Sequence, residues 1–134
     1  MSATAIDRPS FTGFHHYASA VSDLGRSAAW YERVLGLVRT DRPCPEAGGG
    51  GGVLLADPES DIAIRLEGAV DSAPQGQLAF AVASRGQLDT WASWLDGLGI
   101  VHGGVVDVGV PERYAYLVFR DPDDVPLVLV HVAG

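Results

Sequence analysis

The chain has 134 residues, of which 47% are apolar, and this is the size and composition of one globular domain. Nine arginines, no lysine and 17 acidic residues give a net charge of −8. Nucleic acids and anionic membranes select basic surfaces, so this charge argues against both as the main partner. The N-terminus lacks the basic and apolar segments of a signal peptide, and no apolar run approaches ~18 residues, so we predict a soluble, cytoplasmic protein.

The first half of the chain predicts a strand, a helix and three further strands. Its apolar residues first alternate with other residues and then recur every three or four positions. This change of period is typical of a strand that leads into a helix. Gly36 is placed to end that helix, and Asp57-Pro58 is placed to begin a tight turn between two strands. The predicted elements are a strand at 14–21, a helix at 22–37 and strands at 38–41, 53–56 and 62–67.

The second half repeats this plan after a predicted linker at 68–76. Gly97 is placed to end its helix, and Asp121-Pro122 again begins a turn. We predict that the acidic cluster at 121–124 is structural, because the glycine and the distal glutamate of a calcium-binding loop are missing. The predicted elements are a strand at 77–82, a helix at 85–98 and strands near 100–106, at 114–119 and at 127–132.

The two halves are related by an internal repeat. An offset of 61 aligns residues 16–37 with residues 77–98, and seven of these 22 positions are identical where composition alone gives roughly two. The sequence therefore predicts an α+β domain of two duplicated modules, at about 14–67 and 77–132, each made of a strand, a helix and three strands. His16 and Gln77 hold equivalent positions on the two first strands.

Several motifs together resemble the vicinal oxygen chelate superfamily, which includes glyoxalase I, bleomycin- and fosfomycin-resistance proteins and extradiol dioxygenases. They are His16, the run Val21-Ser22-Asp23-Leu24 with Ser27 and Tyr31 after it, Leu35-Gly36-Leu37, and Phe119-Arg120-Asp121-Pro122-Asp123. The resemblance extends from about Phe14 to Val130. It implies two tandem βαβββ modules whose mixed sheets curl into a cup, and a homodimer that builds or completes the cups. It is weak evidence for a particular reaction, because sites diverge on a shared scaffold.

The resemblance also implies four positions for divalent-metal ligands, on the first and last strand of each module. These positions are His16, Arg65, Gln77 and Val128 in this chain. Valine cannot ligate a metal, a neutral glutamine is a weak oxygen donor, and the arginine would repel a divalent cation. We therefore expect no metal cofactor and interpret His16 and Gln77 as vestigial ligand positions.

The preferred functional hypothesis is a metal-independent protein that binds or sequesters a small aromatic or amphipathic molecule between the modules. We expect ligand contacts from His16, Arg65, Gln77, Tyr114, Tyr116 and Val128. Arg65 shares a strand face with Glu67, so it either forms an internal ion pair or holds an anionic group of the ligand. The tyrosines either line the pocket or pack within their hairpin.

Two alternatives remain open from the sequence. One is a lyase, isomerase or dioxygenase with an atypical divalent-metal site, or one that uses acid–base chemistry through His16, the candidate catalytic residue. The other is a structural or regulatory dimer with a vestigial cup. Trp30, Trp91 and Trp94 lie on the predicted helices, where we expect them to be core or interface residues rather than a platform for a ligand.

Overall fold

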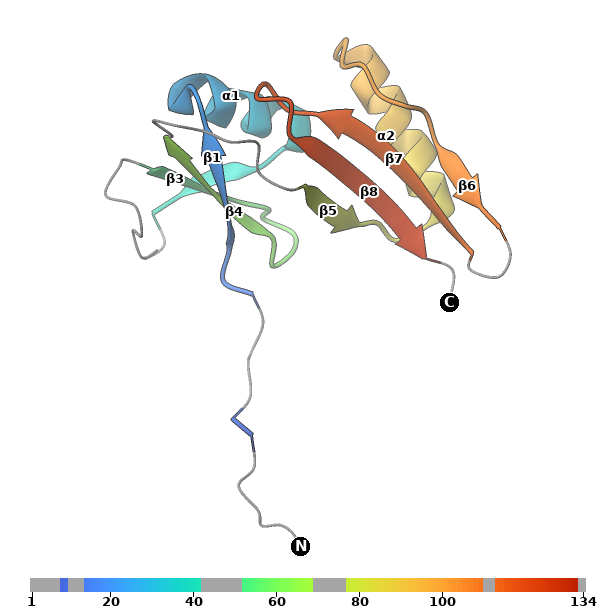
Figure 1. Ribbon diagram of the computed structural model, residues 1–134, viewed down its shortest axis with the longest axis horizontal. Coiled ribbons are helices and arrows are strands. Elements are labelled where there is room, and N and C mark those ends of the chain that lie inside the picture. Colours follow the sequence, from blue (N-terminus) through green and yellow to red (C-terminus); the bar gives the residue numbers. More distant parts are fainter. Residues whose placement is uncertain (1–7, 10–13, 42–51, 69–76, 110–112, 133–134) are drawn as a thin grey trace, which may run out of the picture.

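The structure is a computed structural model that describes residues 8–9, 14–41, 52–68, 77–109 and 113–132. Two modules with the same order of elements lie side by side (Figure 1). Module 1 contains β1 (Tyr17–Val21), α1 (Leu24–Leu35), β2 (Val38–Thr40), β3 (Gly52–Ala56) and β4 (Ala63–Gly68). Module 2 contains β5 (Leu78–Ala81), α2 (Arg85–Gly97), β6 (Val106–Val108), β7 (Tyr114–Arg120) and β8 (Pro126–Val132).

Each module forms its own four-stranded mixed sheet. The strand order is β1-β4-β3-β2 in module 1 and β5-β8-β7-β6 in module 2. In each sheet the first and last strands of the module pair in parallel, and the remaining pairs are antiparallel. This identity of topology confirms the α+β fold of two tandem βαβββ modules predicted from the repeat. His16 and Gln77 each lie immediately before the first strand of their module.

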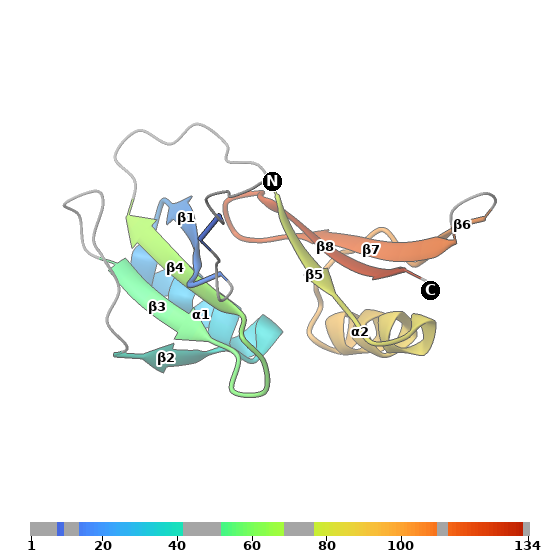
Figure 2. The same ribbon diagram turned by 90° about the horizontal axis from the view of Figure 1, so that it is seen from below.

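One face of each sheet is covered by the helix of the same module (Figure 2). In α1 the buried residues are Ser27, Ala28, Tyr31 and Val34, whose spacing places them on one side of the helix. Asp23 caps the start of α1 by accepting a hydrogen bond from the backbone N–H of Arg26 at 3.0 Å. Gly36 ends the helix with φ of 70°, a left-handed conformation that favours glycine. The sheet face opposite each helix is called the open face below.

The modules are joined by side chains rather than by strand pairing. The turn between β7 and β8 reaches α1, where the Tyr31 hydroxyl donates to Asp121 at 2.7 Å. Asp123 in the same turn accepts from the Ser22 backbone N–H at 3.1 Å. At the other end of α1, Trp94 Nε1 of α2 donates to the Val34 carbonyl at 2.9 Å. The acidic turn at 121–124 therefore has a structural role between the modules.

Two predicted strands begin later in the chain than expected. The first strand begins at Tyr17 rather than residue 14, because its pairing with β4 begins at Tyr17–Ile64. The strand expected near 100–106 lies at Val106–Val108, since Gly104 has φ of 76° and interrupts the extended chain after an isolated bridge at His102.

Gly97 is the last residue of α2 rather than its stop, and the left-handed residue is Gly99, with φ of 74°. Of the linker predicted at 68–76, Gly68 belongs to β4 and the rest lies outside the described residues. No helix in the described part of the chain is both long and apolar enough to cross a membrane.

Candidate functional site

A cavity of about 900 Å³ brings His16 and Gln77 together. It lies between the modules, where the approach to β1 and the start of β4 face β5. Its lining residues fall in three short segments, which are Phe14 to Tyr17, Asp61 to Ile64 and Gln77 to Ala81. The equivalent positions of the two repeats thus meet at one cavity, within the size range of ligand pockets.

His16 is oriented by its neighbour in the chain. The Nδ1 atoms of His15 and His16 are 2.9 Å apart, and the two rings meet edge to face with centroids 5.1 Å apart. Both residues precede β1, so the alternation of side chains along a strand does not yet apply to them and the two neighbouring rings can meet. One Nδ1 must carry a proton and donate it to the other, so this contact links the tautomers of the two rings.

Arg65 lies on the open face of module 1, and its side chain is nearly covered. The residue is 5% exposed, and its Nε donates to Glu67 Oε2 at 3.0 Å. The guanidinium lies over Gly52, where an added Cβ would come within 2.6 Å of Arg65 Cζ. Of the two partners that the sequence allowed for Arg65, the internal one, Glu67, is therefore present in the structure. Arg65 does not line the cavity at His16, so the structure does not bring these two predicted site residues together there.

Tyr114, Tyr116 and Val128 share the open face of module 2. The tyrosine rings stack with centroids 6.2 Å apart and planes at 26°. Val128 lies opposite Val118 in the β7–β8 pairing, two residues along β7 from Tyr116. None of the three predicted residues lines the cavity at His16. They form instead part of an apolar surface that continues to Val106 and Val132, which are 38% and 67% exposed.

The residues at the family's metal positions do not fit a divalent metal. His16 and Gln77 meet at the cavity, but Arg65 is held in an ion pair with Glu67, and Val128 has no donor atom. Within the described residues, no group of three or more His, Cys, Asp or Glu side chains is placed to hold a metal ion. The absence of a metal cofactor stays a prediction.

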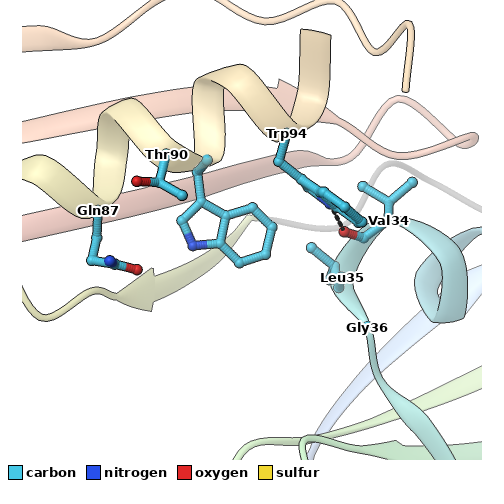
Figure 3. Close-up of a pocket in the computed structure, with 7 residues that line it drawn as sticks. Val34, Leu35, Gly36, Gln87, Thr90 and Trp94 are labelled. Carbon is cyan, nitrogen blue, oxygen red and sulfur yellow. Dashed lines mark hydrogen bonds between the residues drawn. The ribbon is translucent and has the colours of Figure 1, made fainter. Parts of the chain in front are cut away.

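A groove between α1 and α2 was missed by the sequence reasoning (Figure 3). Gln87, Thr90 and Trp94 reach it from α2, and Val34, Leu35 and Gly36 reach it from the end of α1. Trp94 is half exposed while its indole nitrogen is held by Val34, so it is both an interface residue and part of a groove wall. The available signal was the spacing of Gln87, Trp91 and Trp94, which places all three on one side of the helix.

Comparison of this sequence with models of protein families shows the family to which the chain belongs. The model for the Glyoxalase/Bleomycin resistance protein/Dioxygenase superfamily matches residues 13–129. This chain belongs to that superfamily. Comparison with curated protein sequences gave no significant match.

Solved structures of the superfamily share the fold at low sequence identity. A glyoxylase/bleomycin resistance protein/dioxygenase domain from Frankia sp. EAN1pec has a TM-score of 0.74 and 22% identity, over 93% of this chain and 95% of that chain. A lactoylglutathione lyase from Agrobacterium tumefaciens has a TM-score of 0.71 and 16% identity, over 90% and 93% of the two chains. The fosfomycin resistance protein FosX from Listeria monocytogenes has a TM-score of 0.66 and 15% identity, over 92% and 96%. These likenesses support the superfamily fold and do not select a reaction.

Proposed function

We propose that this superfamily member binds a small aromatic or amphipathic molecule between its two modules and does so without a metal ion. The observation that carries the proposal is the meeting of His16 and Gln77 at a cavity of about 900 Å³, in a chain whose other two metal positions are Arg65 and Val128. A histidine ring and an amide can orient a ligand by hydrogen bonds. Apolar residues of the cavity, such as Phe80 and Ile64, then supply most of the affinity.

Arg65 has a second role in this proposal. Its guanidinium is buried beside Glu67, which makes it a fixed charge on the open face of module 1. A ligand with a carboxylate, phosphate or phenolate can be held there by the planar fork, while its flat part rests on Tyr114 or Tyr116. These tyrosines belong to the other module, so a second copy of the chain is one way to bring the two faces together. We therefore propose a homodimer, supported by the partly exposed apolar surface around Tyr114 and Val132.

One observation favours a second candidate, an enzyme that uses His16 as a general acid or base. His16 lines the cavity, and its Nδ1 lies 2.9 Å from Nδ1 of His15, a ring that can fix the tautomer of a catalytic histidine. The reaction class is then a metal-independent lyase or isomerase step, in which His16 moves a proton of the substrate.

Ligand binding without turnover separates the two candidates. A thermal-shift screen of acidic aromatic compounds would first identify a ligand, which is then titrated against the wild type, His16→Ala and Gln77→Ala. We expect saturable binding at one site per chain, a loss of about three- to tenfold in affinity in each variant, and an unchanged compound after prolonged incubation. A chemically converted compound, with conversion lost in His16→Ala, would establish the enzyme instead.

A further inference from the structure

The groove between α1 and α2 continues along α2 toward β5. A cavity of about 290 Å³ contains Trp94 and the end of α1, and a neighbouring cavity of about 250 Å³ contains Asp57 and Phe80. Leu35, Gln87 and Trp91 line both cavities, so the two form one continuous groove. This aromatic groove lies on the helix side of the sheets, away from the open faces that carry Arg65 and the tyrosine pair.

The walls of the aromatic groove combine aromatic surface with negative charge. Trp91, Trp94 and Phe80 supply the aromatic rings. Asp57 is the only charged residue that lines either cavity in the part of the chain that the structure describes, and no described arginine does so. The C-terminal end of α1 also borders the groove, and the helix dipole gives that end a partial negative charge.

Trp94 and Asp57 are both held in fixed positions. The indole nitrogen of Trp94 donates to the Val34 carbonyl at 2.9 Å, which sets the plane of the ring (Figure 3). The Asp57 carboxylate accepts from the Ser60 hydroxyl at 2.7 Å and from the Glu59 backbone N–H at 3.2 Å. Both groups are therefore positioned before a ligand arrives, which lowers the entropy cost of binding.

We propose that the aromatic groove is a binding site for an organic cation with a flat apolar body, such as an aromatic amine or a quaternary ammonium compound. Tryptophan faces attract cations through the ring quadrupole, and a quaternary ammonium group is the cation most readily taken from water by such rings. Asp57 supplies the opposite charge at one end of the groove. A carboxylate ligand is disfavoured here because it would meet Asp57 and the negative end of α1 without a basic residue to pair with.

The sequence provides a matched pair of variants for the test. Asp57 and Asp61 flank the same β3–β4 turn, but Asp57 lines the aromatic groove and Asp61 lines the cavity at His16. Asp57→Asn and Asp61→Asn each remove one negative charge, so their net charges are equal. Asparagine keeps Oδ1, which accepts from the Glu59 backbone N–H, and its Nδ2 can donate to the Ser60 hydroxyl, so we expect Asp57→Asn to retain the turn.

The experiment is a titration of the full chain with benzyltrimethylammonium, followed by NMR of the three indole N–H signals. Benzyl alcohol and phenylacetate are the neutral and anionic probes with the same ring. We expect saturable shifts at Trp91 and Trp94, with Trp30 unmoved because it packs on Tyr31 and Phe119 instead. The cation should bind at least about fivefold more tightly than either other probe.

The variants decide whether the groove is the site. Asp57→Asn should weaken binding of the cation about fivefold and Trp91→Leu about tenfold, whereas Asp61→Asn should change it less than about twofold. Equal binding of the three probes would show a merely apolar groove. An equal effect of the two aspartate variants, or no saturable shift at Trp91 and Trp94, would also overturn the proposal. The aromatic groove shares Ile62, Phe80 and Ala81 with the cavity at His16. Trp91, Trp94 and Asp57 line only the groove, so ligand binding through His16 and Gln77 would survive such a result.

Discussion

Tyr31 and Asp121 form the most fully buried polar contact between the modules. Tyr31 is 0% and Asp121 6% exposed, and the carboxylate also accepts from the backbone N–H groups of Asp123 and Val125 at 2.8 and 2.9 Å. Tyr31→Phe removes the hydroxyl and leaves one carboxylate oxygen without that donor. We expect a loss of about 1–3 kcal/mol in the free energy of unfolding, measured by urea denaturation. Tyr114→Phe, at a half-buried tyrosine on the open face, should change it by less than about 0.5 kcal/mol.

The same pair predicts the response of the fold to alkaline pH. Burial, followed by the hydrogen bond to Asp121, raises the pKa of Tyr31 well above its ordinary value. A tyrosine whose pKa is higher in the folded than in the unfolded chain stabilises the fold fully below about pH 10 and less as the pH rises above that value. The wild type should therefore lose stability between about pH 9.5 and pH 11 more steeply than Tyr31→Phe. The measurement is the free energy of unfolding of both proteins as a function of pH. Parallel curves for the wild type and Tyr31→Phe would contradict this linkage.

The close contact between Arg65 and Gly52 on the open face of module 1 predicts the effect of a substitution at Gly52. The guanidinium occupies the space where a side chain at Gly52 would lie, with Cζ 2.6 Å from the added Cβ. Gly52→Ala should displace the guanidinium and destabilise the fold by about 1–3 kcal/mol, because the crowded side chain is buried. Gly68→Ala is a control in the neighbouring strand, since nothing lies within 4 Å of its added Cβ. Equal effects of the two variants on thermal unfolding would show that Arg65 can move away at little cost.

Arg65 is also predicted to orient an anionic ligand. With an acidic aromatic ligand from the thermal-shift screen, Arg65→Lys should weaken binding because the planar fork is lost, by about three- to tenfold. Arg65→Ala should weaken it further, provided that circular dichroism shows the variant to be folded. If the folded Arg65→Ala protein binds with wild-type affinity, Arg65 has only the structural role seen in its ion pair with Glu67.

At the scale of single elements, the residue pattern predicted each helix and strand that the described part of the chain contains, but not every boundary. The error at the end of α2 shows the reason. Gly97 and Gly99 are both glycines near the expected stop, and the side-chain pattern alone does not say which one has a left-handed backbone. The backbone N–H of Leu98 still bonds to Trp94 and Leu95 carbonyls, so the helix passes Gly97 before it ends.

This geometry predicts opposite effects for two similar substitutions. Gly97→Ala replaces a helical glycine with open space around it, so it should stabilise the fold by about 0.5–1 kcal/mol. Gly99→Ala places a Cβ on a residue with φ of 74°, so it should destabilise the fold by about 1 kcal/mol. Thermal unfolding of both variants would show the difference, and a shift of the same sign in both would contradict the assigned end of α2.

At the scale of the whole molecule, the internal repeat was sufficient to predict two modules of one topology. The packing of the modules on each other was not predictable, because it depends on pairs such as Tyr31–Asp121 and Trp94–Val34 that have no counterpart in the repeat. The same limit applies to the candidate site. The repeat made His16 and Gln77 equivalent, and both line one cavity in the structure. The alternation of side chains along the strands could not show that Arg65 and the tyrosines lie outside that cavity.

The residue types at the metal positions predict a gain of function. Val128→Glu adds the missing carboxylate, and Arg65→Ala removes the positive charge from the open face of module 1. If the proposed homodimer brings the two open faces together, the double variant should bind a divalent transition metal more tightly than the wild type, as measured by calorimetry with Zn²⁺. A buried carboxylate can cost stability, so the comparison requires an unfolding curve for each protein. Unchanged metal affinity in a folded double variant would show that these positions do not converge on one site.

The most direct test of metal-independent binding is metal analysis of the wild-type chain purified without chelators and without an affinity tag that carries nickel. We predict well under one equivalent of iron, manganese, zinc or nickel, because His16 is the only strong ligand at the four superfamily positions. One tightly bound equivalent of any of these metals, lost in His16→Ala, would contradict the account.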